Sequence, residues 1–467
     1  MHYQSLGGTE EITASCHYLN VAGTGLLFDA GMDPEQDGMD AVPPFELLDG
    51  RPVDHVVVTH AHHDHLGSLP VLLQQRPEVQ IHLSKPTMML ADVLLPASAR
   101  LQRRRQMESV TAAAPIFDEA TAEALSYLYE AHNLDTDFDL SGAAASGTVT
   151  GRFYNAGHVL GAVSLHLTIV RDGRTRTVYY TSDVHLRPQN IIPGADIPEG
   201  PIDVLILETT LGADPEAELA TPKEREKALG DAIARVLARG GSVLIPVFAL
   251  GRAQEVVALL DRFKKQRRIP ADVPVFTTGS MRAVADIYDR TRLISPRLDK
   301  DFEVFGVHQS RLPRSRERET EILSKPGIHI AASGMMFEKT LSNSLSQRMI
   351  SDPKNGIFLV GFAKEDSPAD LLLKAAERRA EDPNASVEVT LDRERGPQPL
   401  RAEVERFRFS GHAHRRDLLD IVEKTKPKKI VLVHGERPAK EWMADNIRFF
   451  YPEIEIFAPE QGEEIEL

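Results

Sequence analysis

Cysteine is nearly absent from the chain, which has one thiol, Cys16, in 467 residues. A single cysteine cannot form an internal disulfide, and it excludes a zinc site built from several thiolates. Because Cys16 stands just before an apolar run, we expect it to be a buried small hydrophobic residue. Any metal site must therefore rely on histidine and carboxylate ligands.

Long apolar runs are also missing. No segment approaches the roughly 20 apolar residues that a membrane span needs. Residues 1–10 lack the basic and then apolar profile of a secretory signal peptide. We therefore expect a soluble, cytoplasmic protein with no membrane partner.

The chain also lacks an excess of positive charge. It has 54 Lys and Arg residues and 69 Asp and Glu residues, which gives a net charge of -15. Bulk charge would not attract a phosphodiester, so a nucleic-acid site has to be a local feature. A metal site can supply positive charge locally. Basic clusters, each more typical of a solvated surface than of a nucleic-acid contact, occur at 103–105, 264–268, 311–318 and 424–429.

Short apolar runs alternate with helix-length amphipathic stretches. The predicted strands are 25–29, 54–59, 177–181, 204–207, 242–246, 327–331, 356–360 and 429–433, and clear helical patterns follow at 251–264 and 438–450. With 42% hydrophobic residues the chain can bury a large core. The pattern predicts an α/β fold of mixed α+β layers.

The strongest chemical signal is the hexapeptide His60-Ala61-His62-His63-Asp64-His65, directly after the predicted strand 54–59. Two histidines two apart, His60 and His62, can converge on one ion, while Asp64 and His65 begin a helix that we expect to run through Leu73 and can face a second ion. Imidazole and carboxylate ligands suit zinc. Alternation points His63 away, so it is left out of the ligand set.

Further ligand candidates stand at other strand ends or beside glycine: His158, Asp183, His412 and His434. A lone histidine in such a place is more often structural. Their joint occurrence at strand ends favours a shared site, in which the Asp183 carboxylate could bridge two ions.

An ordered set of motifs resembles the metallo-β-lactamase-fold hydrolases. These motifs are LFDAG (27–31), HAHHDHLG (60–67), GHVLGA (157–162) and TSDV (181–184). Further matches resemble the β-CASP nucleases of that superfamily, at Glu208, IPVFALGRAQ (245–254), SGM (333–335), FSGHA (409–413) and VHGE (433–436). The resemblance covers nearly the whole chain.

The resemblance implies an αββα sandwich with an inserted α/β domain, the β-CASP domain. The expected limits are 1–210 and 400–467 for the two parts of the sandwich and 211–399 for the insert. One zinc would be held by His60, His62 and His158, and the other by Asp64, His65 and His434. Asp183 would bridge the two ions. Asp29 resembles a carboxylate that orients a ligand without binding metal.

The same resemblance implies a mechanism. A zinc-bound hydroxide would attack phosphorus, His412 would be the general acid, and Glu208 would orient it. Among residues of the matched motifs, Ser333, Ser410 and Arg252 are expected to contact the substrate.

RNA is the expected substrate because relatives acting on RNA carry histidine at the position of His434, whereas DNA-repair relatives carry valine. We expect single-stranded RNA as the partner, with a homodimer left open. The chain resembles bacterial and archaeal relatives of the polyadenylation-factor endonuclease and is related to ribonuclease J.

Two segments depart from the family pattern, at 336–339 and 363–368, where glycines are replaced and Glu365 and Asp366 add negative charge. They put the substrate path in question. Three alternatives therefore stay open. These are a DNA exonuclease, a hydrolase of a small ester, thioester or phosphodiester on the same core, and an inactive scaffold that binds RNA or a partner nuclease.

Overall fold

The computed structural model describes residues 1–9, 12–108, 110–313, 316–382 and 385–467. They form two compact units, one from Met1–Pro215 together with His412–Leu467 and the other from Glu216–Gly411. The first unit is thus assembled from two distant segments of the chain. The predicted limit at 399/400 falls before β19 (Glu403–Arg406), which belongs to the second unit because it pairs with β16 (Gly356–Leu359).

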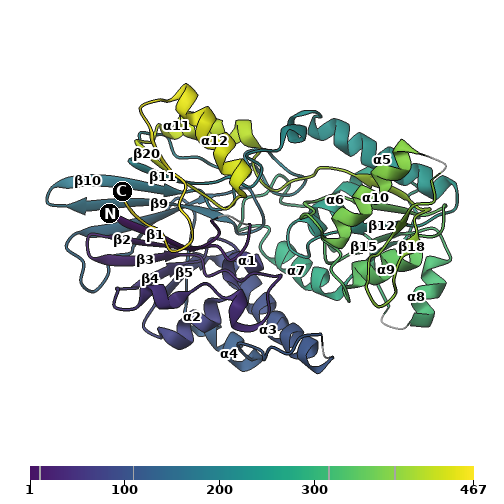
Figure 1. The fold of residues 1–467 in the computed structure, drawn as a ribbon, viewed down its shortest axis with the longest axis horizontal. Coiled ribbons are helices and arrows are strands. Elements are labelled where there is room, and N and C mark those ends of the chain that lie inside the picture. The colour runs from purple at the N-terminus through teal and green to yellow at the C-terminus, as the bar shows by residue number, and fades with distance from the viewer. Residues whose placement is uncertain (10–11, 109, 314–315, 383–384) are drawn as a thin grey trace. The chain divides into compact units, whose positions relative to one another are not determined.

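Two seven-stranded sheets form the first unit (Figure 1). In spatial order the first sheet contains β22 (Glu464–Glu466), β1 (His2–Gly7), β2 (Cys16–Val21), β3 (Thr24–Phe28), β4 (His55–Val57), β5 (Gln80–Ser84) and β6 (Tyr129–His132). The second contains β21 (Glu455–Phe457), β20 (Lys429–Val433), β11 (Val204–Glu208), β10 (Arg174–Tyr180), β9 (Val163–Arg171), β8 (Thr148–Asn155) and β7 (Asp137–Asp139). Both sheets are mixed, with a parallel block on one side.

A continuous apolar core lies between the two sheets. It joins Phe28 and Val57 of the first sheet to Leu165, Ile206 and Val433 of the second. Strand β8 alternates between buried and more exposed residues along its length, as expected when one of its faces packs on this core. Cys16 is fully buried at the start of β2, which confirms the expected packing role.

Helices cover the outer faces of the sandwich. Figure 1 shows α11 and α12 above the strands and α2, α3 and α4 below them. Their bounds are α1 (His63–Leu66), α2 (Leu69–Gln75), α3 (Lys85–Met107), α4 (Glu119–Ala124), α11 (Arg415–Thr425) and α12 (Arg437–Phe450). Leu418 of α11 and Ile447 of α12 pack with Leu205 and Leu432 from the outer face of the second sheet. The result is the four-layered α/β sandwich that the sequence predicts.

The helix expected to run from the HAHHDH motif through Leu73 is instead broken in two, which corrects that prediction. Helix α1 ends at Leu66 and α2 begins at Leu69. Pro70 lacks the N–H that a continuous helix would use and would crowd the carbonyl group of Leu66, so it suits a new first turn. The N–H of Ser68 donates instead to the carbonyl oxygen of Ala30, 2.9 Å away.

The second unit is built on a six-stranded parallel sheet. Its order is β14 (Ser310–Arg311), β13 (Val275–Thr277), β15 (Ile328–Ala331), β12 (Val243–Pro246), β16 and β19. Its helices are α5 (Pro222–Ala238), α6 (Arg252–Lys265), α7 (Gly279–Arg290), α8 (Arg316–Leu323), α9 (Leu341–Met349) and α10 (Pro368–Glu381), and β17 (Glu388–Val389) pairs with β18 (Gln398–Pro399). Residues 314 and 315 of the predicted basic cluster lie outside the described residues.

The two segments that depart from the family pattern keep backbone conformations that glycine favours. Met336, Lys339 and Asp366 all have φ near +60°, in the left-handed region. The negative charge added by Glu365 and Asp366 is not isolated, because the Lys374 ammonium lies 3.8 Å and 3.6 Å from their carboxylates. Non-glycine residues therefore occupy left-handed positions in both segments.

A left-handed residue also ends α11, and it yields a test of the fold. Lys426 has φ 44° and ψ 58°, and its N–H donates to the carbonyl oxygen of Val422. Glycine relieves the Cβ crowding of this conformation, so Lys426→Gly is expected to raise the free energy of unfolding by about 0.5–1 kcal/mol. Lys424→Gly, inside the same helix and equally exposed, is the control and should lower it by about 1 kcal/mol. Urea denaturation measures both, and equal effects would contradict the left-handed end.

Candidate metal centre and active site

The site residues gather where parallel strands of the two sheets end. Asp29 follows β3, His60 follows β4, Asp183 follows β10, Glu208 ends β11 and His434 follows β20. Carboxyl ends of parallel strands meet at one edge of a sheet, which is why residues so far apart in sequence converge. The seven ligands predicted from the sequence and the pair His412 and Glu208 all lie in the first unit.

Glycine makes the close packing of these loops possible. A Cβ at Gly31 would lie 1.8 Å from the carbonyl oxygen of Asp64, so only glycine lets the LFDAG loop approach the histidine motif. Gly157, just before His158, has φ +69° and would clash with the carbonyl oxygen of His185. Both glycines belong to the motifs singled out in the sequence.

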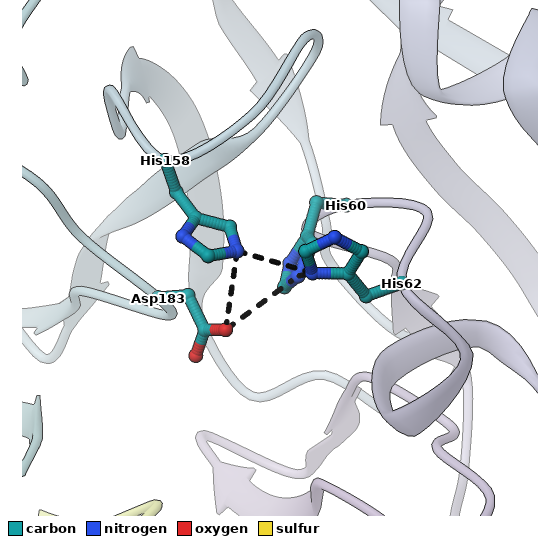
Figure 2. Close-up of side chains that lie close together, drawn as sticks. All are labelled: His60, His62, His158 and Asp183. Carbon is teal, nitrogen blue, oxygen red and sulfur yellow. Dashed lines mark hydrogen bonds and ion pairs between the residues drawn. The ribbon is translucent and has the colours of Figure 1, made fainter. Parts of the chain in front are cut away.

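The first cluster contains His60, His62, His158 and Asp183, whose side chains point toward one another in Figure 2. Nδ1 of His62 lies 3.1 Å from Nε2 of His60 and 3.1 Å from Nε2 of His158. Oδ2 of Asp183 lies 3.6 Å and 3.5 Å from the same two Nε2 atoms. Two ligand atoms that each lie about 2.0–2.1 Å from one zinc ion would be separated from each other by distances similar to those between these side chains.

The second cluster contains Asp64, His65 and His434. Oδ2 of Asp64 lies 3.9 Å from Nε2 of His65 and 3.7 Å from Nε2 of His434. Oδ1 of Asp183 lies 3.4 Å from Nε2 of His65 and 3.1 Å from Nδ1 of His434. The two oxygens of Asp183 therefore face different clusters.

Burial strengthens the electrostatic interactions between the side chains of the two clusters. Asp183 is 2% exposed, and although burial disfavours its charge, the imidazoles of His434 and His65 hold its pKa well below the ordinary value. Burial also opposes charge on His65, but the carboxylates of Asp183 and Asp29 keep its pKa well above the usual range. Burial lowers the pKa of His60, which leaves that ring neutral and able to donate a lone pair to a metal.

The donor set fits zinc. Among the described residues, Nε2 of His65, Nε2 of His434 and Oδ1 of Asp183 are buried atoms without a hydrogen bond, although other polar atoms lie nearby. Buried polar atoms are normally satisfied, so three such atoms in one place indicate a ligand-binding site. Asp29, Ser182 and His434 also have φ between 48° and 62°, a strained conformation that concentrates at functional sites. Imidazole and carboxylate groups without thiolates suit zinc.

A histidine–carboxylate pair lies beside the two clusters. Nδ1 of His412 donates to Oε1 of Glu208 at 3.2 Å, and the His412 ring packs against that of His158 with centroids 4.6 Å apart. Glu208 is fully buried and is itself fixed by the N–H groups of Val184 and Thr210. Burial opposes charge on His412, but Glu208 and Asp183 raise its pKa to about 9. The ring is therefore protonated at neutral pH and can act as an acid.

Asp29 lies behind the second cluster. Its Oδ2 is 2.9 Å from Nδ1 of His65, while Oδ1 accepts the N–H of Thr59 at 2.7 Å. Tyr180 donates its hydroxyl to Oδ2 at 3.0 Å. Thr210 similarly contacts Nδ1 of His434 at 3.1 Å.

Thr59, Tyr180 and Thr210 were not singled out in the sequence. Each is an ordinary strand-end residue, and only its position next to a motif could have drawn attention to it. Their contacts orient the imidazoles, a role that a sequence pattern of metal ligands does not reveal.

The remaining predicted residues lie elsewhere. Nε2 of His63 is 3.0 Å from the sulfur of Met32, and His63 belongs to neither cluster. Arg252 begins α6, Ser333 follows β15 and Ser410 follows β19, so all three belong to the second unit and their contact with substrate stays a prediction. Among the described residues, no helix combines the length and apolar character needed to cross a bilayer.

Comparison with known protein families identifies three regions of the chain. Residues 11–177 match the metallo-beta-lactamase superfamily. Residues 253–372 match the Beta-Casp domain, and residues 397–459 match the "Zn-dependent metallo-hydrolase RNA specificity domain". Together the three matches cover most of the chain, in the order that the motifs indicate.

Similar proteins include endoribonuclease YSH1 of Eremothecium gossypii, which is 27% identical over 92% of this chain and 54% of its own length. Cleavage and polyadenylation specificity factor 73 of Drosophila melanogaster is 27% identical over 97% of the chain and 64% of its own length. An RNase J-like protein of Methanocaldococcus jannaschii is 27% identical over 92% of the chain and 91% of its own. The chain thus spans about half to two thirds of the first two relatives and nearly all of the third.

A solved structure shares the fold. A protein of unknown function from Enterococcus faecalis V583 aligns with a TM-score of 0.54 at 16% identity, covering 100% of this chain and 99% of that one. Motifs, fold and family matches agree. The chain contains a metallo-beta-lactamase superfamily region, a Beta-Casp domain and a region that matches the RNA specificity domain of Zn-dependent metallo-hydrolases.

Proposed function

We propose that this chain is a zinc-dependent nuclease that hydrolyses phosphodiester bonds of single-stranded RNA. One observation carries the proposal: two adjacent clusters of candidate metal ligands share Asp183, and His412, paired with Glu208, lies beside them. Two neighbouring cations together with a proton donor form one effective arrangement for phosphodiester hydrolysis. Residues 397–459 match an RNA specificity domain, and relatives of the chain are named endoribonucleases. Both findings support RNA as the substrate.

The centre holds two zinc ions in this proposal. His60, His62 and His158 would hold the first, Asp64, His65 and His434 would hold the second, and Asp183 would contribute to both sites. When bound, the ions lower the pKa of a water molecule to about 7 and stabilise negative charge on the phosphate oxygens. Local positive charge of this kind lets a chain with a net charge of -15 accept a polyanion.

The protein groups around the ligands keep them in place. Asp29 accepts from Nδ1 of His65, which turns Nε2 of that ring toward Asp183. Thr59 and Tyr180 in turn fix the Asp29 carboxylate. Such outer contacts set ring orientation and the basicity of the ligand.

His412 supplies the proton for the leaving oxygen. Its Nδ1 is engaged by Glu208, so Nε2 is the nitrogen that donates. Glu208 keeps the imidazole protonated and in the orientation needed for donation. Because water is the nucleophile in this proposal, the products carry a 5′-phosphate and a 3′-hydroxyl. A positioned acid of this kind accelerates a reaction by roughly 100- to 10,000-fold.

The function is tested with end-labelled RNA and DNA oligonucleotides of the same sequence. We expect cleavage of the RNA, products with 5′-phosphate and 3′-hydroxyl ends, and loss of activity with a chelator that added zinc restores. Preference for the DNA strand would replace the proposal by a DNA exonuclease. Turnover of a small ester or thioester with both oligonucleotides intact would refute nuclease action.

The ligand assignment predicts a selective loss of metal. His434→Ala removes a ligand of the second cluster, so the protein should hold one zinc ion fewer per chain than wild type and lose RNA cleavage. His166→Ala is the control, since His166 lies in the same unit on β9 and in neither cluster. Elemental analysis after gel filtration gives the counts, and an unchanged count in His434→Ala would rule out its role as a ligand.

A third experiment separates His412 from the ligands. His412→Ala should keep the wild-type zinc content while kcat falls by roughly 100-fold or more. Glu208→Gln should cause a smaller loss, and the double variant should lose little more than His412→Ala, because the two residues act as a unit.

A substrate with a better leaving group provides the control. It needs less protonation, so it should restore much of the activity of His412→Ala and none of that of His434→Ala. Equal recovery in both variants, or loss of zinc from His412→Ala, would show that His412 is not the proton donor.

A further inference from the structure

A second group of imidazoles lies away from the centre at Asp183, at the edge of the first sheet. His55 begins β4, His82 lies within β5 and His132 ends β6, the edge strand. In the parallel register His82 pairs with Glu130 and Ser84 pairs with His132. Because side chains alternate along strands, His82, Glu130 and His132 share one face of the sheet.

These side chains are within metal-binding distance of one another. Nδ1 of His82 lies 2.9 Å from Nε2 of His132 and 3.8 Å from Oε2 of Glu130. Two ligand atoms on one tetrahedral zinc ion are about 3.3 Å apart. The nitrogen pairs of the His60, His62 and His158 cluster are 3.1 Å apart, so the two sites resemble each other in spacing.

Neighbouring side chains fix the orientation of the His82 and His132 rings. Nε2 of His82, the nitrogen that does not face His132, lies 3.0 Å from Nδ1 of His55. The His132 ring stacks on Phe138, with centroids 3.9 Å apart and planes 10° from parallel. A ligating histidine normally engages a partner through its other nitrogen, which fixes the tautomer and the ring orientation.

We propose that His82, His132 and Glu130 bind a zinc ion at the edge between β5 and β6, separate from the centre at Asp183. Two imidazoles and a carboxylate form a known ligand set for zinc, with a fourth position left for water.

The bound ion would link the edge strand β6 to β5. Strand β6 is the last strand of its sheet and is paired on one side only, through β5. His82 is 1% exposed, whereas the Glu130 side chain is 53% exposed, so the site opens to solvent on the Glu130 side. Zinc bound there can exchange with the medium, and it links two strands that are otherwise joined by backbone hydrogen bonds.

The test is a zinc count on protein that has been stripped with a chelator, reloaded with Zn²⁺ and passed through a desalting column. His132→Gln should hold one zinc ion fewer per chain than wild type. Glu130→Gln should weaken one zinc site by at least about 10-fold in competition with a chelating dye. In crystals, anomalous scattering at the zinc edge should place an ion between His82 and His132.

Matched controls are His166→Gln on β9 and Glu123→Gln on α4, neither of which belongs to a cluster. Both should keep the wild-type count, and all four variants should cleave RNA as wild type does, so a failure of the proposed nuclease function would be seen separately. Equal zinc counts in His132→Gln and His166→Gln would overturn the proposal and leave the three histidines as a hydrogen-bonded chain. If His132→Gln does not fold, Glu130→Gln decides, and wild-type affinity there would equally overturn the site.

Discussion

A single buried carboxylate, that of Asp183, joins the two clusters of candidate metal ligands. Its two oxygens face two separate groups of imidazoles. A charge this deeply buried is unfavourable unless cations or hydrogen-bond donors surround it. Three features of the fold surround the Asp183 carboxylate. They are the convergence of strand ends, the glycines that let the loops come into contact, and the left-handed residues beside them.

Much of this arrangement could be predicted, because strand ends and metal ligands leave local patterns. The hexapeptide after 54–59 indicated His60, His62, Asp64 and His65, and the structure brings these together with His158, Asp183 and His434. The short apolar runs predicted the strands because a strand buried on both faces is apolar along most or all of its length, as β11 and β12 are.

Not every contact between distant segments could be predicted. Tyr180 touches Asp29 from 151 positions away, and nothing near Tyr180 in the sequence specifies that partner. The helix after the motif was expected to be continuous because its apolar pattern continues, but Pro70 and the bond from Ser68 to Ala30 divide it. Replacement of glycine at 336–339 put the substrate path in question, and the sequence did not show that Met336 and Lys339 would adopt positive φ, a conformation that only the surrounding structure can impose.

The division of the first unit between two segments has a consequence for synthesis. A chain leaves the ribosome from its N-terminal end, so His60, His62, His158 and Asp183 emerge long before His412 and His434. Strand β1 likewise waits for β22, its partner on one side. Six of the seven candidate ligands, Asp64 and His65 among them, are therefore made before the last segment, which supplies His434 and also His412.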